Sequence, residues 1–362
     1  MVRTKRNCSK TEGPDLRLSD FDYVLPEELI AQTPLPRRDD SRMMVVDRRS
    51  GEIRHEMFKD FPERLSPGDL VVLNDTRVLP ARAWGFKDRC RLEFLFIGEP
   101  EPGLWEVLCR PAKRLRKGAV VRLASGLEAE VEDVGEEGRR FLRFEGMDVR
   151  AELRRSGFAP LPPYIRRNRE DTAKRAEDLE RYQTVFAGKE GAIAAPTAGL
   201  HFTPLIFDRL RARNVRTARI TLDVGLATFQ PVRTEAIADH KMLEERYCVR
   251  RETAGEINAA RAEKRPLVAV GTTVVRTLET ASFPGPEGPR IRAGKGTSSL
   301  FIRPGHEFQI VDRLLTNFHL PKSTLLVLVS AFAGRDLVLE AYRKAVRERY
   351  RFFSYGDCMF IL

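Results

Sequence analysis

The sequence predicts an α/β protein in which a small antiparallel β-barrel domain is inserted into a large α/β domain. Residues 70–145 show short alternating strands with frequent Gly and Pro turns, a pattern typical of a small barrel. After Asp148 strands alternate with helices, as in an α/β layer. With 362 residues and 42% apolar content the chain can build two domains. We expect a disordered basic arm at 1–17, the large domain at 18–78 and 150–362, and the inserted barrel at 79–149.

The first globular segment contains a predicted helix and a predicted hairpin. We expect a short helix over 26–32 and a strand over 42–47 (RMMVVD), and residues 49–51 (RSG) provide a turn into a second strand.

The barrel strands are predicted from apolar residues at every second position, which places these side chains on one face. Turns rich in Gly, Pro and Glu separate the strands. The alternating sets are Leu92, Phe94 and Phe96, then Trp105, Val107 and Cys109, then Leu127, Ala129 and Val131, with a further strand over 140–144.

The second half of the large domain shows helical starts and buried strands in alternation. Thr203 is a predicted N-cap followed by Pro204 at the first helical position. A strand over 267–270 ends in Gly271-Thr272-Thr273 and leads into a helix. The other expected elements are a strand over 215–224 and helices over 252–264, 274–280, 324–333 and 336–349.

Charge and composition narrow the function classes. The net charge of +11 favours a polyanionic partner, although an arginine-rich solvated surface gives the same balance. No stretch of eighteen apolar residues and no signal-like segment follows the basic N-terminus, so we expect a cytoplasmic protein without a membrane partner. The five cysteines are scattered and the five histidines show no i, i+4 pairing, so no metal site is predicted.

Familiar nucleotide motifs are absent. The segment 294–297 (GKGT) resembles the end of a phosphate-binding loop but lacks the glycine at the required spacing, and we interpret it as a mobile loop. No GxGxxG follows a strand, which argues against a Rossmann-type methyltransferase or dehydrogenase.

Three segments combine small, polar or aromatic residues next to apolar runs. In 194–202 (AAPTAGLHF) backbone amides can hold an anion and His201 can exchange a proton, or the segment is a plain turn with a packed histidine. In 270–276 (VGTTVVR) a ligand can bind at the strand end, or a threonine simply caps the helix. In 350–357 (YRFFSYGD) the aromatics can stack a base or pack a core, and Asp357 is less readily explained by packing.

Together these segments resemble the S-adenosylmethionine:tRNA ribosyltransferase-isomerase family. The resemblance runs in order from near Asp20 to the C-terminus and leaves only the basic arm outside. Each segment alone is weakly specific, whereas eleven in the right order are highly specific. They read DSRMMVVDRRSGEIRH, PGDLVVLNDTRVLPAR, WEVLCRPAKRL, PLPPYI, ERYQTVFA, AAPTAGLHF, TFQPVR, VAVGTT, VRTLE, TNFHLPKSTLLVLVSAFAG and YRFFSYGD.

The resemblance implies a barrel-like α/β domain with an inserted β-barrel, and S-adenosylmethionine as co-substrate. It implies ribosyl transfer to 7-aminomethyl-7-deazaguanine in tRNA with a GUN anticodon, giving epoxyqueuosine-tRNA, adenine and methionine. Such a reaction needs a base for the C5′ hydrogen made acidic by the sulfonium, and a site that excludes water. We expect the protein to act as a monomer.

The resemblance also directs attention to particular residues. We assign acid–base work to His201 or Asp357, with Asp223 as a third catalytic candidate. Arg276 is expected to hold the methionine carboxylate. The other expected substrate-binding residues are Pro196, Thr197, Gly199, Gly271, Thr272, Thr273, His319 and Tyr355, and Arg77, Arg82 and Arg110 are expected to meet the RNA.

The chain departs from the family pattern at several positions. Asp223 replaces a histidine, and Ala227 replaces a glycine, which matters if that position needs φ > 0. Leu243 also replaces a histidine, and Val274 replaces a serine. These changes leave open an alternative in which the chain is a catalytically impaired family member that binds RNA.

Overall fold

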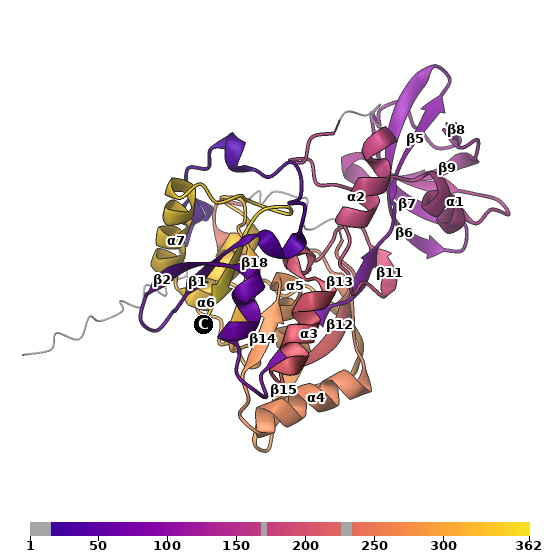
Figure 1. Ribbon diagram of the computed structural model, residues 1–362. Helices are drawn as coiled ribbons and strands as arrows, with labels where there is room; N and C mark the ends of the chain where they lie inside the picture. The colour runs from indigo at the N-terminus through magenta and orange to yellow at the C-terminus, as the bar shows by residue number, and fades with distance from the viewer. Residues whose placement is uncertain (1–15, 168–171, 226–233) are drawn as a thin grey trace, which may run out of the picture.

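The computed structural model describes residues 16–167, 172–225 and 234–362. A nine-stranded mixed sheet organises the large domain, and the barrel projects from it (Figure 1). Strands β12, β3, β14 and β18 are parallel neighbours, and β19 is parallel to β1. In sheet order the strands are β17 (Gly294–Ser298), β13 (Glu245–Val249), β12 (Arg216–Leu222), β3 (Leu70–Asn74), β14 (Leu267–Val270), β18 (Arg313–Asn317), β19 (Cys358–Ile361), β1 (Arg42–Val46) and β2 (Ile53–Met57).

Helices cover both faces of this sheet because the side chains of its central strands alternate between two apolar cores. Along β3, Leu70 and Val72 face the core that includes α4 (Arg251–Ala262), α5 (Thr272–Ala281), α6 (Thr324–Ala333) and α7 (Arg335–Arg347). Val71 and Leu73 face the other core, which includes α3 (Pro204–Ala212).

The predicted capping of α3 is confirmed. Thr203 accepts a hydrogen bond from the amide of Ile206, and Pro204 occupies the first helical turn. Helix α5 begins at Thr272, two residues earlier than expected, because Gly271 adopts φ +90° and ends the strand abruptly.

The inserted barrel is closed and antiparallel, as predicted. Its strands follow the order β10 (Arg139–Arg143), β7 (Leu104–Arg110), β6 (Cys90–Glu101), β5 (Arg82–Lys87), β8 (Val120–Leu123) and β9 (Glu128–Val134). The alternating residues predicted from the sequence fill its interior, with Phe94, Phe96, Val107 and Val131 fully buried.

Two local predictions need correction. The short helix expected over 26–32 is present but shorter, as a 3-10 helix over Glu27–Leu29. Residues 294–297 are not a mobile loop but most of the edge strand β17, which pairs with β13. Gly296 is required there, since an added Cβ would lie 2.7 Å from the Tyr247 ring.

Shorter elements lie near the junction of the two domains, namely α1 (Val149–Ser156), α2 (Arg175–Arg181) and the pair β4 (Thr76–Val78) and β11 (Lys189–Ala192). The pair β15 (Ser282–Gly285) and β16 (Gly288–Ile291) lies instead beside α4 (Figure 1). The isolated bridge of Arg17 with Ala236 begins the described chain, and residues 1–15 of the expected arm lie outside the described residues. Within the described ranges no helix is long and apolar enough to cross a membrane.

Candidate active site

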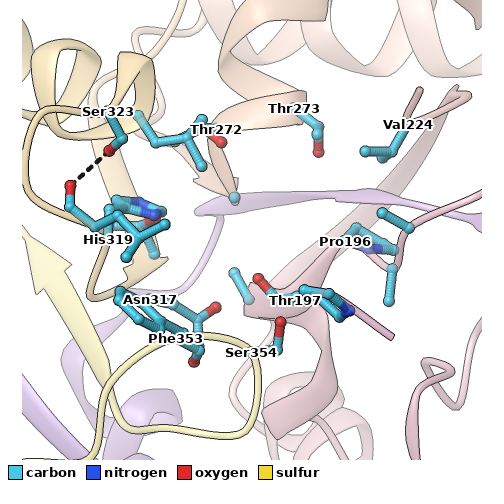
Figure 2. A pocket seen from close by; sticks show the side chains of 18 of the residues that line it. Pro196, Thr197, Val224, Thr272, Thr273, Asn317, His319, Ser323, Phe353 and Ser354 are labelled. Carbon is cyan, nitrogen blue, oxygen red and sulfur yellow. Dashed lines mark hydrogen bonds between the residues drawn. The ribbon is translucent and has the colours of Figure 1, made fainter. Parts of the chain in front are cut away.

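A cavity of about 250 Å³ lies where the parallel strands β14 and β18 end (Figure 2). Ligands of α/β sheets bind at such strand ends. The wall is built from segments that are far apart in sequence, around Tyr164, Pro196, Gly271, Asn317 and Phe353. Among the predicted substrate-binding residues, those that line this cavity are Pro196, Thr197, Gly271, Thr272, Thr273, Arg276 and His319.

The N-terminus of α5 forms one wall of the cavity. Thr272 and Thr273 stand at its first turn (Figure 2), and the Asn74 side chain donates a hydrogen bond of 3.3 Å to the Thr273 hydroxyl. The partial positive charge of a helix N-terminus favours an anionic group at this wall.

Arg276 and Glu245 form a buried ion pair in the cavity lining. The guanidinium also donates to the carbonyls of Leu300 and Ser298, both at 3.2 Å, and Glu245 accepts from the Gly225 amide at 3.0 Å. The sequence predicted Arg276 alone as the group that holds a carboxylate. In the structure Arg276 is one half of a matched ion pair, and the sequence analysis did not identify its partner Glu245.

His319 lies in the cavity wall as a neutral imidazole. Burial lowers its pKa to about 3, and Nε2 lies 2.8 Å from the Thr316 hydroxyl. Its backbone carbonyl accepts from Tyr23 and its amide donates to Tyr342. The ring is thus held by both its side chain and its main chain.

His201 lies behind the cavity rather than in its lining. Its Nδ1 lies 2.7 Å from the Ser41 hydroxyl and its Nε2 lies 3.2 Å from Asn317 Nδ2. Burial, helped by Arg38 and Arg351, lowers its pKa to about 3. Because both ring nitrogens are engaged and the imidazole is neutral, the geometry favours positioning of Asn317 over proton transfer.

Asn317 is a cavity residue that the sequence reasoning missed. Its Nδ2 also donates to the carbonyl of Phe353 at 3.2 Å. These acceptors fix the orientation of the amide, because reversing it would set its oxygen against a carbonyl oxygen. Within the described residues Oδ1 has no hydrogen-bond partner. The signal was present in TNFHLP, but only the fold brings this side chain to the cavity.

Asp357 and Tyr355 lie outside the main cavity. The two carboxylate oxygens of Asp357 accept from the amides of Arg42 and Arg351, each at 2.8 Å, while burial raises the carboxyl pKa. Asp357 therefore joins β1 to the segment before β19. Tyr355 lines a water-sized pocket of about 20 Å³ beside His201.

Gly199 and Asp223 also lie outside the cavity lining. Gly199 is explained by packing, since an added Cβ would lie 2.7 Å from the Phe186 ring. Asp223 precedes the cavity residue Val224 and accepts from the Thr76 hydroxyl at 3.2 Å. Burial is the largest effect on Asp223 and raises its pKa.

Two further departures from the family pattern lie away from the described cavity wall. Val274 is fully buried in the core and Leu243 is 37% exposed at the surface, and neither lines the cavity. Ala227 and the segment TFQPVR lie outside the described residues.

A second cavity, of about 300 Å³, lies at the junction of the two domains. Arg82 and Arg110 from the barrel line it, and both are among the residues expected from the sequence to meet the RNA. Arg77 lies elsewhere and donates to the carbonyl of Ala187 at 2.8 Å. The large domain contributes Arg166, Arg167 and Arg175.

One segment separates the two cavities. Pro162 and Tyr164 line the first cavity, and Leu161, Pro163 and Ile165 line the second. Neighbouring residues thus face opposite cavities, so the PLPPYI segment forms a thin common wall. In the described parts of the chain, no cluster of three His, Cys, Asp or Glu residues could hold a metal ion.

Comparisons with known proteins agree with this architecture. The model of a family described as queuosine biosynthesis protein matches residues 18–361. The chain is 49% identical over 350 residues to the S-adenosylmethionine:tRNA ribosyltransferase-isomerase of Clostridium kluyveri, covering 96% of this chain and 100% of that protein. The enzyme of the same name from Carboxydothermus hydrogenoformans is 50% identical with the same coverage.

A solved structure resembles the whole chain as well. The crystal structure of S-adenosylmethionine tRNA ribosyltransferase from Thermotoga maritima is 39% identical, with a TM-score of 0.54, and the match covers 95% of this chain and 100% of that one.

Proposed function

Because this chain belongs to the queuosine biosynthesis protein family and is an S-adenosylmethionine:tRNA ribosyltransferase-isomerase, we propose that it modifies 7-aminomethyl-7-deazaguanine in tRNA with a GUN anticodon. S-adenosylmethionine is the ribosyl donor. The products are epoxyqueuosine-tRNA, adenine and methionine. We further propose that the enzyme works as a cytoplasmic monomer.

The observation that carries this proposal is the convergence on one cavity. Seven of the nine residues expected to bind substrate line it, although they come from three separate segments of the sequence. A concave site of about 250 Å³ suits a small molecule that is to be partly shielded from water.

The buried ion pair suits the methionine end of S-adenosylmethionine. An amino acid carries a carboxylate and an ammonium, and Arg276 with Glu245 offers the complementary charges side by side. The carboxylate would pair with Arg276 and with the N-terminus of α5, and the ammonium with Glu245. Thr197, Thr272 and Thr273 would add hydrogen bonds from the same wall.

The proposed reaction begins when a base removes one C5′ hydrogen, which the sulfonium has made acidic. The ribose opens and adenine leaves. The aminomethyl nitrogen of the tRNA base attacks the former C1′, and closure of the epoxide expels methionine. Each step moves charge within a closed site, so positioned dipoles such as the neutral imidazole of His319 contribute most when water is excluded.

Among the three acid–base candidates, we retain Asp223 as the base, although it lies outside the cavity lining, because it directly precedes the lining residue Val224. Within the described residues only its Oδ1 accepts a side-chain hydrogen bond, from Thr76. Its pKa is raised by burial, and a carboxylate with a raised pKa is a better proton acceptor. His201 and Asp357 have their polar atoms engaged in holding other groups, so we propose positioning roles for them.

The RNA is proposed to approach from the junction cavity. Arg82 and Arg110 line that cavity, and phosphate contacts from arginine position nucleic acid without reading sequence. The target nucleotide would pass the common wall at Tyr164 to reach the first cavity. Arg77, at 2.8 Å from the Ala187 carbonyl, would add a contact outside both cavities.

The decisive experiment incubates the protein with S-adenosylmethionine and tRNA bearing 7-aminomethyl-7-deazaguanine. Adenine release together with an epoxyqueuosine nucleoside supports the proposal. Tight RNA binding without either product contradicts it and favours the RNA-binding alternative. Asp223→Asn is expected to lose adenine release at least 100-fold, whereas Asp223→His, which restores the family's residue, is expected to retain it.

A further inference from the structure

A cationic loop on the barrel lines neither cavity except through its first residue, Arg110. It comprises residues 110–118 (RPAKRLRKG), from the last residue of β7 towards β8, and we name it the basic loop. No acidic residue lies between Glu106 and Glu128. Its five cations are all exposed, namely Arg110, Lys113, Arg114, Arg116 and Lys117.

These cations are left without partners by the fold. None of the five side chains forms a hydrogen bond or an ion pair with any other described residue. Two other barrel arginines differ, since Arg122 pairs with Glu128 and Arg143 pairs with Glu132. Protein surfaces usually intersperse charges of both signs, because like charges repel one another. Five neighbouring cations, none of them held in an ion pair, therefore create a local positive potential.

The basic loop is held rigidly from below. Leu115 is only 1% exposed and packs in the barrel core. Arg140, itself 7% exposed, donates to the carbonyls of Leu115 at 2.6 Å and Ala112 at 2.7 Å. The Gly118 amide donates to the Val131 carbonyl at 2.8 Å. A buried guanidinium is thus used to fix a loop backbone, so the cations above it are presented in a defined arrangement.

The loop is continuous with the junction cavity, because Arg110 belongs to both. We propose that the basic loop is a docking surface for the phosphate backbone of the tRNA, lying on the approach to the junction cavity. This inference rests on the proposed function, which supplies the tRNA. Neutralising phosphates releases condensed counterions, so the contribution of each contact appears as salt dependence of the affinity.

The test compares two triple variants of the full chain. Lys113→Gln/Arg114→Gln/Arg116→Gln removes three charges from the basic loop. The matched control, Arg343→Gln/Arg347→Gln/Arg349→Gln, removes three exposed charges at the end of α7, on the opposite side of the molecule from the barrel (Figure 1). The measurements are the affinity for tRNA between roughly 50 and 200 mM salt, the range over which phosphate contacts dominate the salt dependence, and the affinity for S-adenosylhomocysteine.

The loop variant is expected to bind tRNA roughly 10- to 100-fold more weakly at low salt, with the slope of log K against log salt reduced by about 2 to 3. Its affinity for S-adenosylhomocysteine is expected to be unchanged, and the control is expected to match the wild type. An unchanged slope in the loop variant, or an equal loss in the control, overturns the proposal. Salt-dependent tRNA binding without adenine release from the wild type would sink the proposed function and leave the loop assignment intact.

Discussion

The two cavities on either side of the segment 161–165 differ in their balance of charge. In the first cavity Arg276 and Glu245 form a matched buried ion pair, and the histidine of the wall is neutral. The junction cavity is lined by five arginines and two acids and continues into the unpaired cations of the basic loop. The first arrangement suits a small zwitterionic molecule recognised by hydrogen bonds, and the second suits a polyanion recognised by charge.

The largest effect is expected from breaking the matched pair in the first cavity. Glu245→Ala leaves a buried guanidinium without its counter-charge, and should lower the free energy of unfolding by about 3–5 kcal/mol. Urea denaturation measures this loss. The double variant Glu245→Leu/Arg276→Met is expected to recover much of the stability but not the binding of S-adenosylhomocysteine. A stable Glu245→Ala protein with full binding would show that the pair is not the feature that distinguishes this cavity.

A second test uses the neutral histidines of the large domain. His201 and His319 have folded-state pKa values of about 3, below the ordinary value near 6.5. As pH falls below about 6.5, the unfolded chain takes up protons that the folded protein refuses. Below that pH each histidine should therefore lower the free energy of unfolding by up to about 1.4 kcal/mol per pH unit. Above pH ~6.5 neither state binds the proton, and the two histidines cause no such loss.

Urea unfolding between roughly pH 5 and 7 checks this slope in the wild type and in His201→Gln. Glutamine can hydrogen-bond to Ser41 and Asn317 but cannot titrate, so the variant should lose about half of the two-histidine slope. Identical slopes in the two proteins would contradict the assignment of a neutral, buried His201.

A smaller effect separates structural from catalytic carboxylates. Asp357→Asn replaces an oxygen that accepts from one of the amides of Arg42 and Arg351, and should cost about 1–3 kcal/mol of unfolding free energy. Adenine release at saturating substrate should stay within a few-fold of the wild type. If instead turnover is abolished at unchanged stability, Asp357 takes part in the chemistry and the contrast with Asp223 fails.

The smallest effect belongs to a single cation of the junction cavity. Arg110→Ala should weaken tRNA binding by roughly threefold to tenfold and lower the salt slope by about 1. Arg122→Ala is the matched control, since it removes a barrel arginine that is already paired with Glu128. Equal losses in both variants would mean that total charge, rather than the junction, governs RNA binding.

Local sequence patterns predicted those elements whose apolar alternation or helix cap lies within a few residues. The alternation in 92–96 predicted a barrel strand, and the caps Thr203 and Pro204 predicted the start of α3. Pro196, Thr197 and Thr272, which were expected to bind substrate, lie in the cavity wall, and the sequence directs attention to them because strand ends and helix starts are visible in it.

Long-range packing decided what the sequence could not show. No local pattern marks Glu245, which only the fold brings against Arg276. Asn317 became a cavity residue only through His201 and Phe353, which are distant in sequence. Strand β19 was not predicted, since a short continuous apolar run without alternation gives no periodic signal.

The position of β19 between β18 and β1 also has a kinetic meaning. The barrel closes through pairings between strands that are near one another in sequence, whereas β1 meets β19 across some three hundred residues. Contacts of such separation form slowly, because loop closure must precede them. In refolding, the barrel should therefore appear early, and the cavity around Asn317 and Phe353 late. Recovery of S-adenosylhomocysteine binding would then time the slowest step of folding rather than collapse of the chain.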